Sequence, residues 1–356
     1  MERHSHPDSL VLVLNVGSSS LKACLIDPTG ARVWQNQTDG PAAALEGGWP
    51  QALAPWRDRI ALVGHRVVHG GERFTEPTRI TATLLEQLEA LVPLAPLHNA
   101  AALAVIRSMR AWQPTLDQWA CFDTGFHSSL VAAAYTYAIP QRWRAAGLRR
   151  FGFHGLNHQH VSEVVMAQRG RPAPLRLISC HLGAGCSLAA IRDGRSIDTT
   201  MGYTPLEGLV MATRSGSVDP GLLLHQLRSG QGVDSLEHEL QHDSGLRGLS
   251  GISGDMRELR QAAAAGHPGA LLALDVFLHR LLQGIGAMAA SLGGVDVIAL
   301  TGGIGQNDQV LLADLRARLD WLQPVELVAV PADEEGMIAR LCRQASRDRD
   351  LPSDRD

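Results

Sequence analysis

Short apolar runs alternate with small polar connections along most of the chain. Residues 10–26 contain two such runs around a connection rich in serine, and a Pro-Thr-Gly turn follows them. This pattern predicts a hairpin of two buried strands. Residues 177–192 repeat the pattern, and the step from Gly17 to the equivalent Gly183 is 166 residues. A repeated hairpin of this kind predicts two similar α/β domains.

Two longer segments have the spacing of apolar residues that is typical of helices. They are residues 82–92 and 268–292. The second begins at a proline and ends at a glycine pair, which are common helix boundaries. Because it contains charged residues such as Asp275, we expect a core helix there and no membrane span. After the first helix, a double-proline turn should present Leu97 and His98 to a cleft.

Composition narrows the class of protein. The chain has 356 residues, more than one core usually holds, so two domains are expected. A formal net charge of −4 without a long basic block argues against a nucleic-acid partner. Five cysteines form no C-x-x-C pair, as expected for buried free thiols in a reducing cytosol. The polar N-terminus lacks a signal-peptide pattern, so we expect a cytoplasmic protein with no membrane partner.

Two charged residues stand in or beside buried strands. Arg66 lies in the apolar run 60–68, and Asp123 stands at the end of another such run. A buried guanidinium needs an anion beside it. That anion is either a carboxylate of the chain, in a structural ion pair, or a bound ligand. His65 and His69, on either side of Arg66, are interpreted as structural residues.

Three connections contain the glycine and hydroxyl residues that let backbone N–H groups approach phosphate oxygens closely. They are residues 15–22, 181–187 and 301–308. The last precedes a predicted helix, so it is a ready anion site. None has a Walker A sequence or the Rossmann spacing, which argues against NAD. An ordinary polar turn is the alternative for each.

Two further segments carry candidate anion-binding side chains. His154 lies among aromatic and glycine residues, which favours a packed loop. Its neighbours His158 and His160 do not complete a tetrahedral set with cysteine, so zinc is not expected. The segment 198–221 combines many Gly, Thr and Pro residues with apolar ones, and Arg214 lies within it. There a guanidinium and backbone donors can converge on an anion, and an exposed surface loop is the alternative.

The segment 198–221 closely resembles the signature of the acetate kinase family, whose members phosphorylate short carboxylic acids with ATP. Five further segments between residues 11 and 340 resemble the same family in the same order. The family belongs to the actin and sugar-kinase fold group. The resemblance therefore implies an α/β fold of two duplicated actin/ribonuclease-H-like domains with an interdomain active-site cleft. We place the N-terminal domain at 1–127 with a returning segment at 336–356, and the C-terminal nucleotide-binding domain at 128–335.

The resemblance also assigns roles to individual residues. The implied substrate-binding residues are Arg66 for the carboxylate and Val68, Leu97, Phe153 and Pro205 for the acyl group. The implied catalytic residues are Asp123, His154 and Arg214. Magnesium, or manganese in its place, is implied near Asn15 and Glu334, mostly through water. The implied ATP- and ADP-binding residues are Ser18, Ser20, Lys22, His181, Leu182, Gly183, Ala184, Gly185, Asp255, Met256, Arg257, Gly303, Ile304, Gly305, Gln306 and Asn307.

The implied reaction is reversible, direct in-line transfer of a phosphoryl group from ATP to acetate, which yields acetyl phosphate. Three sites depart from the family pattern: Ala184 replaces Asn, Leu156-Asn157 replaces Thr-Ser, and Gln306 replaces Glu. Two alternatives therefore stay open. One is a kinase of propionate or butyrate, and the other is a nucleotide-binding protein with weak or no kinase activity. The resemblance also implies a homodimer and a chain shorter than its family at the C-terminal returning segment.

Overall fold

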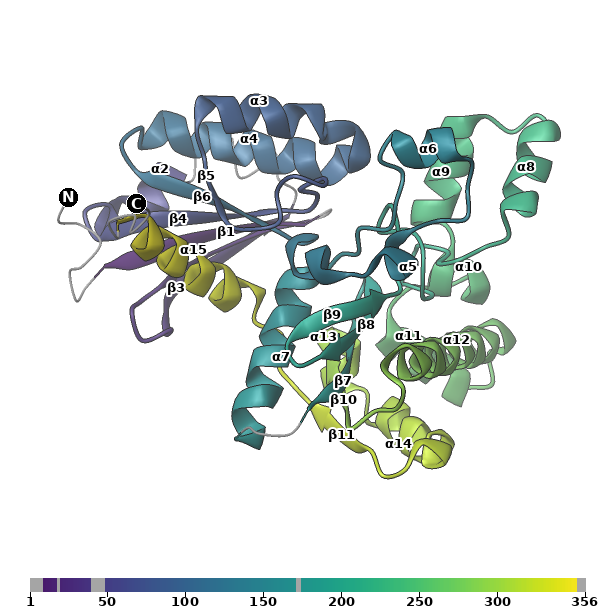
Figure 1. Cartoon of the computed structure of the whole chain (residues 1–356). Helices are drawn as coiled ribbons and strands as arrows, with labels where there is room; N and C mark the ends of the chain where they lie inside the picture. The colour runs from purple at the N-terminus through teal and green to yellow at the C-terminus, as the bar shows by residue number, and fades with distance from the viewer. Residues whose placement is uncertain (1–8, 18–19, 40–48, 171–173, 351–356) are drawn as a thin grey trace. The chain divides into compact units, whose positions relative to one another are not determined.

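The computed structural model describes residues 9–17, 20–39, 49–170 and 174–350 (Figure 1). The chain forms two compact units. The first unit comprises Met1–Phe126, Gly155–Asn157 and Asp333–Asp356, and the second comprises His127–His154 and His158–Ala332. Ser18, one of the expected nucleotide-binding residues, lies outside the described residues. Each unit is built on its own mixed sheet.

The sheet of the first unit has six strands in the order β3-β2-β1-β4-β6-β5. The strands are β1 (Leu10–Val16), β2 (Ser20–Ile26), β3 (Arg32–Asp39), β4 (Ile60–Val67), β5 (Thr78–Arg79) and β6 (Asp117–Phe122). β1 and β2 form the predicted antiparallel hairpin, with Asn15 opposite Lys22. β4 and β6 continue the sheet in parallel with β1. This order brings the carboxyl ends of the three parallel strands, and with them Asn15, Arg66 and Asp123, to one edge of the sheet.

β1 contributes to two separate cores because successive side chains of a strand point to opposite faces. Its even-numbered residues pack with α4 (Pro96–Trp112) on one face. Its odd-numbered residues Val11 and Val13 pack with α15 (Glu334–Asp350) on the other face. Among the described residues, this unit also has the α-helices α2 (Trp49–Leu53) and α3 (Ala82–Ala90), and α3 contacts α4. The sheet is thus covered by helices on both faces, as expected for an α/β fold.

α15 returns the chain to the first unit. Met337, Ile338 and Cys342 are buried in the core that it shares with β1. Gly64 of β4 lets the helix approach, since a Cβ there would lie 2.5 Å from a methyl carbon of Ile338. The returning segment begins at Asp333, earlier than the expected residue 336, and so includes Glu334. The polar stretch after residue 341 continues α15, because one side of it is buried against the sheet.

The sheet of the second unit has five strands in the order β11-β10-β7-β8-β9. The strands are β7 (Arg176–Leu182), β8 (Cys186–Arg192), β9 (Arg195–Thr199), β10 (Val297–Thr301) and β11 (Glu326–Ala329). β7, β8 and β9 are antiparallel neighbours, and β10 and β11 extend the sheet in parallel. In the first unit β1, β2, β3, β4 and β6 have the same order and directions. The prediction of two duplicated α/β domains is therefore confirmed.

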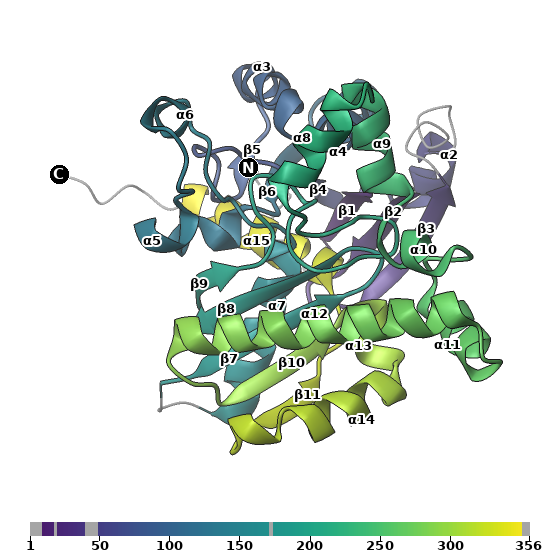
Figure 2. The same cartoon turned by 90° about the vertical axis from the view of Figure 1, so that its right-hand side faces the viewer.

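The longest helix of the second unit, α12 (Pro268–Leu292), crosses one face of its sheet (Figure 2). It contacts β8, α10 (Gly245–Ser250) and α11 (Met256–Ala264). Its length and composition alone would allow it to cross a membrane. However, Ala273, Phe277 and Leu281 are buried at helical spacing, so α12 is a core helix of this unit, as predicted. The other helices are α5 (Ala132–Tyr135), α6 (Gln141–Ala145), α7 (Gly155–Arg169), α8 (Pro220–Arg228), α9 (Val233–His242), α13 (Gly302–Asn307) and α14 (Gln309–Arg318).

Three helices differ from the sequence-based expectation. Pro96 opens α4, so Leu97 lies in a first helical turn and not in a double-proline turn. The reason is that the fixed φ of proline suits the first helical position. α7 begins directly after His154, where a packed loop was expected. The glycine connection after β10 is itself helical as α13, because Gly302 turns the chain with φ 80°.

Because three histidines are buried, we predict that the protein loses stability in mild acid. Burial lowers the pKa of His65 and of His127 to about 4, and lowers the pKa of His158 well below its usual range. The unfolded chain binds these protons near pH 6.5, so each histidine should remove up to about 1.4 kcal/mol of unfolding free energy per pH unit below that. Urea unfolding at pH 7, 6 and 5 measures the effect. Equal stability at pH 7 and pH 5 would contradict it, and His65→Gln should flatten the profile.

Candidate active site

In the first unit, Arg66 is the centre of a buried polar cluster. Its Nη2 and Nε donate hydrogen bonds to Oδ2 of Asp123, at 2.6 and 3.0 Å. Its Nη1 donates to Oδ1 of Asn15 at 3.1 Å. Arg66 comes from β4, Asn15 from β1 and Asp123 from the turn after β6, so the parallel strands assemble the cluster. The structural ion pair, one of the two alternatives for Arg66, is therefore present.

The ion pair does not use all the hydrogen-bond donors of Arg66. Burial raises the pKa of the Asp123 carboxyl above its usual value, and Arg66 opposes that shift. Burial alone would lower the pKa of Arg66, but Asp123 and Glu334 outweigh this effect and raise it. A guanidinium has five N–H donors, and the contacts among described residues use one each on Nε, Nη1 and Nη2. The remaining two suit a second carboxylate, so the two alternatives for Arg66 are compatible.

Asn15 links Arg66 to two carboxylates of α15. Its Nδ2 donates to Oε2 of Glu334 at 3.1 Å and to Oε1 of Glu335 at 2.8 Å. Glu335 was not expected from the sequence. Carboxylate and amide oxygens are the ligands that magnesium prefers. Among the described residues, no three His, Cys, Asp or Glu side chains are placed to hold an ion together.

The other expected residues of this unit lie around the same strands. Ser20 closes the first hairpin, where its carbonyl accepts a hydrogen bond from the Gly17 N–H at 2.8 Å. Lys22 is exposed and lines a small cavity of about 400 Å³ with Arg32 and Glu335. The lysine is thus accessible to a charged ligand.

Val68 follows β4 and is buried. Its neighbour His69 exchanges two backbone–side-chain hydrogen bonds with Asn99, at 3.1 and 3.0 Å. Asn99 lies in the first turn of α4, so these bonds hold Val68 near the turn that contains Leu97. The side chain of Leu97 lies outside the described residues. His65 bonds to Gln118 at 2.8 Å in the core, which supports the structural interpretation of His65 and His69.

In the second unit, the candidate catalytic side chains meet at Gly185. A Cβ at this glycine would lie 3.2 Å from Nε2 of His154 and 3.7 Å from Nη1 of Arg214. The ring of His181 stacks on His154 with centroids 4.2 Å apart. Three segments that the sequence analysis singled out therefore converge on one glycine turn. A guanidinium and an imidazole beside exposed backbone form a ready anion site.

His154 has a strained backbone. It is the N-cap of α7, with φ 57° in the left-handed region. Among the described residues, the only other non-glycine with positive φ is Asp193, in a hairpin turn. Such a conformation costs free energy and persists where the surrounding structure imposes it, often at functional sites. Strain at this position agrees with a functional role for His154.

The second hairpin turn is built from backbone contacts. The Gly183 N–H donates to the Gly185 carbonyl at 3.0 Å, so it is used within the turn. The Ala184 carbonyl accepts from the N–H of Ala212 at 3.0 Å, which ties the turn to the Arg214 segment. Ala184 is exposed and Leu182 is buried. Phosphate binding in this conformation would therefore depend on groups other than the Gly183 N–H.

Arg214 is held by its own loop. Its Nη1 donates to the carbonyl of Pro205 at 3.4 Å, and its carbonyl accepts from the N–H of Met211 at 3.2 Å. Phe153, the residue before His154, is buried, and its carbonyl bonds to Nε2 of His127 at 3.0 Å. Of these two residues, both expected at the acyl pocket, Pro205 thus contacts Arg214, and Phe153 contacts His127.

Glu207 anchors the loop that carries Pro205. It accepts hydrogen bonds from Nη2 of Arg150 at 2.8 Å and from the hydroxyl of Tyr137. Arg150 also donates through Nη1 to three successive backbone carbonyls, those of residues 199–201. The sequence analysis missed Glu207, Arg150 and Tyr137. The one available signal was that Glu207 is the single acidic residue between 199 and 218.

We expect Glu207→Ala to lower the unfolding free energy by about 1–3 kcal/mol, because two hydrogen bonds to a charged group are lost. It should also lower kcat, since Pro205 and hence Arg214 lose their anchor. Thermal melting and steady-state kinetics measure the two effects. Glu237→Ala removes an exposed acid of the same unit and is the matched control. Glu207→Ala with the melting temperature and kcat of the control would contradict the assignment.

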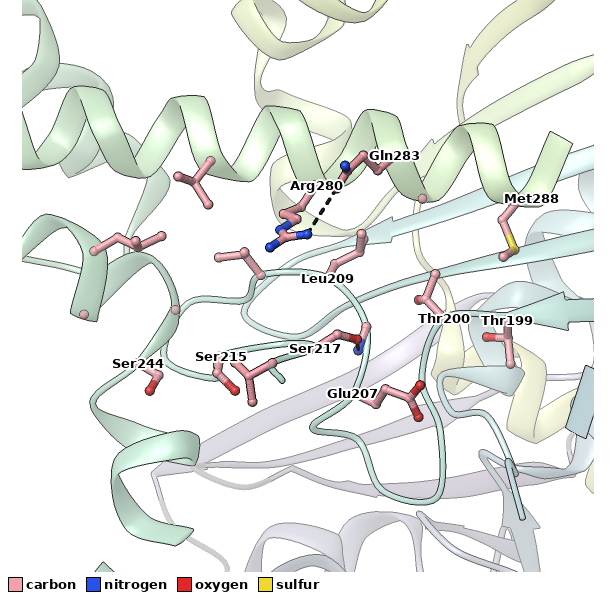
Figure 3. A pocket seen from close by; sticks show the side chains of 18 of the residues that line it. Thr199, Thr200, Glu207, Leu209, Ser215, Ser217, Ser244, Arg280, Gln283 and Met288 are labelled. Atoms are coloured by element: carbon pink, nitrogen blue, oxygen red, sulfur yellow. Dashed lines mark hydrogen bonds between the residues drawn. The ribbon is translucent and has the colours of Figure 1, made fainter. Parts of the chain in front are cut away.

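Behind this loop the second unit contains a cavity of about 750 Å³. Figure 3 shows Glu207, Leu209 and Ser217 on the loop side and Arg280 on the α12 side of this cavity. None of the expected site residues that the structure describes lines it. The cavity is therefore separate from the His154 and Arg214 cluster and shares only the loop with it.

Asp255 and Arg257 bond to each other at the start of α11. The Asp255 carboxylate accepts from the Arg257 N–H at 2.8 Å and pairs with its Nη2 at 2.6 Å. Asp255 is thus the N-cap of α11. Met256 between them is buried, while the Arg257 side chain is exposed. Of these three residues, Arg257 has the side chain best placed to reach a ligand.

The start of α13 lies beside the second hairpin turn. A Cβ at Gly183 would be 3.9 Å from the Gly303 N. Gly303 is exposed, and no atom lies within 4 Å of the position of a Cβ there. Asn307 closes the turn by donating to the Gly303 carbonyl at 2.8 Å. Of the other expected residues, Gly305 is buried and Ile304 and Gln306 are half-buried. The open space over Gly303 suits a nucleoside.

Comparisons with known proteins show the family of this chain. Residues 48–344 match the Acetokinase family. The chain is 44% identical to an acetate kinase of a Synechococcus species, with 94% of this chain and 98% of that protein covered. It is 50% identical to an acetate kinase of Nostoc punctiforme, with 83% and 84% covered.

Solved structures agree as well. The acetate kinase of Porphyromonas gingivalis superposes with a TM-score of 0.85 at 32% identity, covering 94% of this chain and 99% of that one. A propionate kinase from Francisella tularensis gives a TM-score of 0.87 at 32% identity, with the same coverage. Because both the family match and the relatives cover most of the sequence, this chain belongs to the acetokinase family.

Proposed function

We propose that this protein is an acetate kinase that transfers a phosphoryl group reversibly between ATP and acetate. The observation that carries the proposal is the convergence of His154 and Arg214 on the glycine turn at Gly185. Two such donors suit the equatorial oxygens of a phosphoryl group during transfer. The similar curated proteins are named acetate kinases, which supports the same activity.

The transfer is direct and in line, so positioning and charge neutralisation supply most of the catalysis. Arg66 holds the acetate carboxylate with its two remaining donors. His154 and Arg214 stabilise the charge that develops on the phosphoryl oxygens. Carboxylic acids are ionised near neutral pH, so acetate needs no general base. Asp123 therefore orients Arg66 and contributes negative charge on the metal side.

The oxygen donors of Asn15, Glu334 and Asp123 would hold magnesium, mostly through water. When bound, magnesium neutralises charge on the nucleotide phosphates. ATP is the proposed donor because the open space over Gly303 accommodates a base and ribose, which pyrophosphate lacks. Titration with ADP and with pyrophosphate distinguishes the two donors, and tight binding of pyrophosphate alone would reject ATP.

A hydroxamate trap for acyl phosphate tests the function. The purified protein is incubated with ATP, magnesium and equal concentrations of acetate, propionate or butyrate. We expect the highest kcat/KM with acetate, because Val68 fills space that a longer chain needs and each methylene changes binding by about 1–3 kcal/mol. Equal or higher efficiency with butyrate would favour the larger-acid alternative. Absence of any hydroxamate, with ADP still bound, would favour the nucleotide-binding alternative.

We also propose a cytoplasmic homodimer. The support is the exposure of three leucines of α8, since Leu222, Leu224 and Leu227 are 49%, 50% and 37% exposed. A short helix with several exposed leucines is typical of a contact surface. Sedimentation velocity measures the mass in solution. A monomer for the wild-type protein, or a dimer unchanged by Leu224→Glu, would reject this surface.

The departure at Ala184 leads to a further prediction. Ala184 is exposed on the second hairpin turn, and the Gly183 N–H is already used within that turn. An asparagine at 184 would add an amide donor for a phosphate oxygen, a bond worth roughly 1.5–3 kcal/mol. We therefore expect Ala184→Asn to raise kcat/KM for ATP by about ten-fold. Steady-state kinetics with a melting curve checks this, and a folded variant of equal or lower efficiency would show that the turn needs no amide.

A further inference from the structure

We propose that Ser187 and His158 form a hydrogen-bonded relay that fixes the ring plane and the tautomer of His154. Neither residue has a part in the proposed chemistry, and neither was singled out from the sequence for this purpose. The inference rests on the proposed function only where it assigns His154 to the phosphoryl group. Ser187 and His158 would act through His154, which makes them positioning residues.

The relay is a continuous chain of four side chains. Oγ of Ser187, on β8, is 2.9 Å from Nδ1 of His154 and 2.8 Å from Nε2 of His158. Oγ of Ser179, on the neighbouring β7, is 2.8 Å from Nδ1 of His158. Ser179, Ser187 and His158 are all 0% exposed. Bulk water therefore does not compete for these bonds, and they are stronger than bonds at the surface.

The hydrogen-bonded side chains of the relay share a limited number of protons. Burial lowers the pKa of His158 well below its usual range, so its ring is neutral near pH 7. A neutral imidazole has one N–H and one acceptor nitrogen, and a serine hydroxyl has one O–H. Ser187 therefore donates to at most one of its two histidines. The choice decides which nitrogen of His154 carries the proton.

One choice gives His154 the form that transfer needs. If Ser187 accepts from His158 Nε2, it donates to Nδ1 of His154, and the proton of a neutral His154 lies on Nε2. That nitrogen lies on the side of Gly185, 3.2 Å from the position of a Cβ. In the reverse arrangement Nε2 carries a proton only when His154 is charged. The contact with Ser179 is compatible with the first arrangement, in which its hydroxyl donates to Nδ1 of His158 and the His158 proton lies on Nε2.

The relay also fixes the ring plane. The last torsion of a histidine is broad and roughly two-fold, so a ring without a partner on Nδ1 would rotate. The left-handed backbone of His154 directs the side chain towards β8. Ser187 then holds Nδ1, and Nε2 is directed to the opposite side. When His154 is neutral, the expected result of the first arrangement is an N–H on Nε2, on the side of Gly185.

Ser187→Ala removes the central hydroxyl. We expect kcat to fall about ten-fold or more while the KM for acetate and for ATP stays within about two-fold, since the loss concerns alignment in the transition state. Ser162→Ala is the matched control. It removes another buried hydroxyl of the same unit, which contacts the sulfur of Met166 and no histidine. The control should keep the wild-type kcat.

A spectroscopic readout separates positioning from stability. Ring ¹⁵N signals of His154, assigned by comparison with His154→Gln, report which nitrogen carries the proton. We expect the Nε2–H form in the wild-type protein and in Ser162→Ala, and a changed signal in Ser187→Ala. Ser187→Cys retains a weaker hydrogen-bonding atom and should restore part of kcat. A folded Ser187→Ala with wild-type kcat and unchanged His154 signals would overturn the relay.

A Ser187→Ala variant that does not fold and a failure of the proposed function each require a different measurement. If Ser187→Ala does not fold, Ser187→Cys and Ser179→Ala answer the question, because each weakens one link of the relay. Wild-type kcat and unchanged His154 signals in both would overturn it. The NMR readout requires no turnover, so it tests the relay even where the proposed function fails. Wild-type turnover in His154→Gln would reject the proposed role of His154 and leave the tautomer result standing.

Discussion

Replacing Arg214 with alanine is expected to lower kcat by a factor of about 10²–10³, with little change in the KM for acetate. The guanidinium lies with His154 beside Gly185, where it would meet charge that develops only during transfer. The fold should survive, because the contacts of the Arg214 backbone with Met211 do not depend on the side chain. Steady-state kinetics and a melting curve measure both effects.

Two further variants make this result specific. Arg316→Ala removes an exposed arginine of the same unit, on α14, and should keep the wild-type kcat. Arg214→Lys keeps the charge but loses the planar fork, so its kcat should lie between those of wild type and Arg214→Ala. A folded Arg214→Ala with wild-type kcat would show that the guanidinium does not contact the phosphoryl group during transfer.

The repeated fold could be predicted because its signal is local. Each hairpin has two apolar runs around a small turn, and the pattern of β1 and β2 reappears in β7 and β8. The α12 boundaries were equally clear, since Pro268 and Gly293 flank an apolar helical pattern. Such features depend on neighbours within a few residues, which is the range over which sequence patterns carry information.

The supporting residues of the site could not be predicted, because their partners are distant in the sequence. Glu335 bonds to Asn15 across 320 positions, and Arg150 bonds to Glu207 across 57. Nothing in the neighbouring residues specifies these pairs. Ser187 was visible only as one more serine in a small loop. Its importance appears when α7 brings His158 and His154 to the same hydroxyl.

The helix at 302–307 shows a different limit. A run of glycines has low helix propensity, so a loop was the natural prediction. In the structure, Gly302 makes a turn that a side chain would prevent, since a Cβ there would lie 2.6 Å from the Leu182 carbonyl oxygen. The helical turn that follows is closed by Asn307. Tertiary contacts with β7 therefore outweigh the local preference of the segment.

The second large effect is expected for the substitution of Arg66 by alanine. Arg66→Ala is expected to lower the unfolding free energy by about 3–5 kcal/mol, because it leaves the buried Asp123 carboxylate without its cation. It should also raise the KM for acetate by about 10–100-fold, because a hydrogen bond between charged groups is lost. Arg79→Ala breaks an exposed ion pair with Asp117 in the same unit and should cost no more than about 1 kcal/mol.

The structural and binding roles of Arg66 can be separated by a second substitution. In Arg66→Ala/Asp123→Asn the buried charge is gone, so part of the lost stability should return while the KM for acetate stays high.

The stability of the single variant Arg66→Ala should also depend on pH. Burial already raises the pKa of Asp123, and without Arg66 the pKa should rise further. Because a carboxyl whose folded-state pKa lies above its unfolded value favours the folded state when protonated, the stability deficit of Arg66→Ala should shrink as the pH falls. A deficit that stays constant from pH 7 to pH 5, or a KM for acetate equal to that of Arg79→Ala, would contradict the dual role of Arg66.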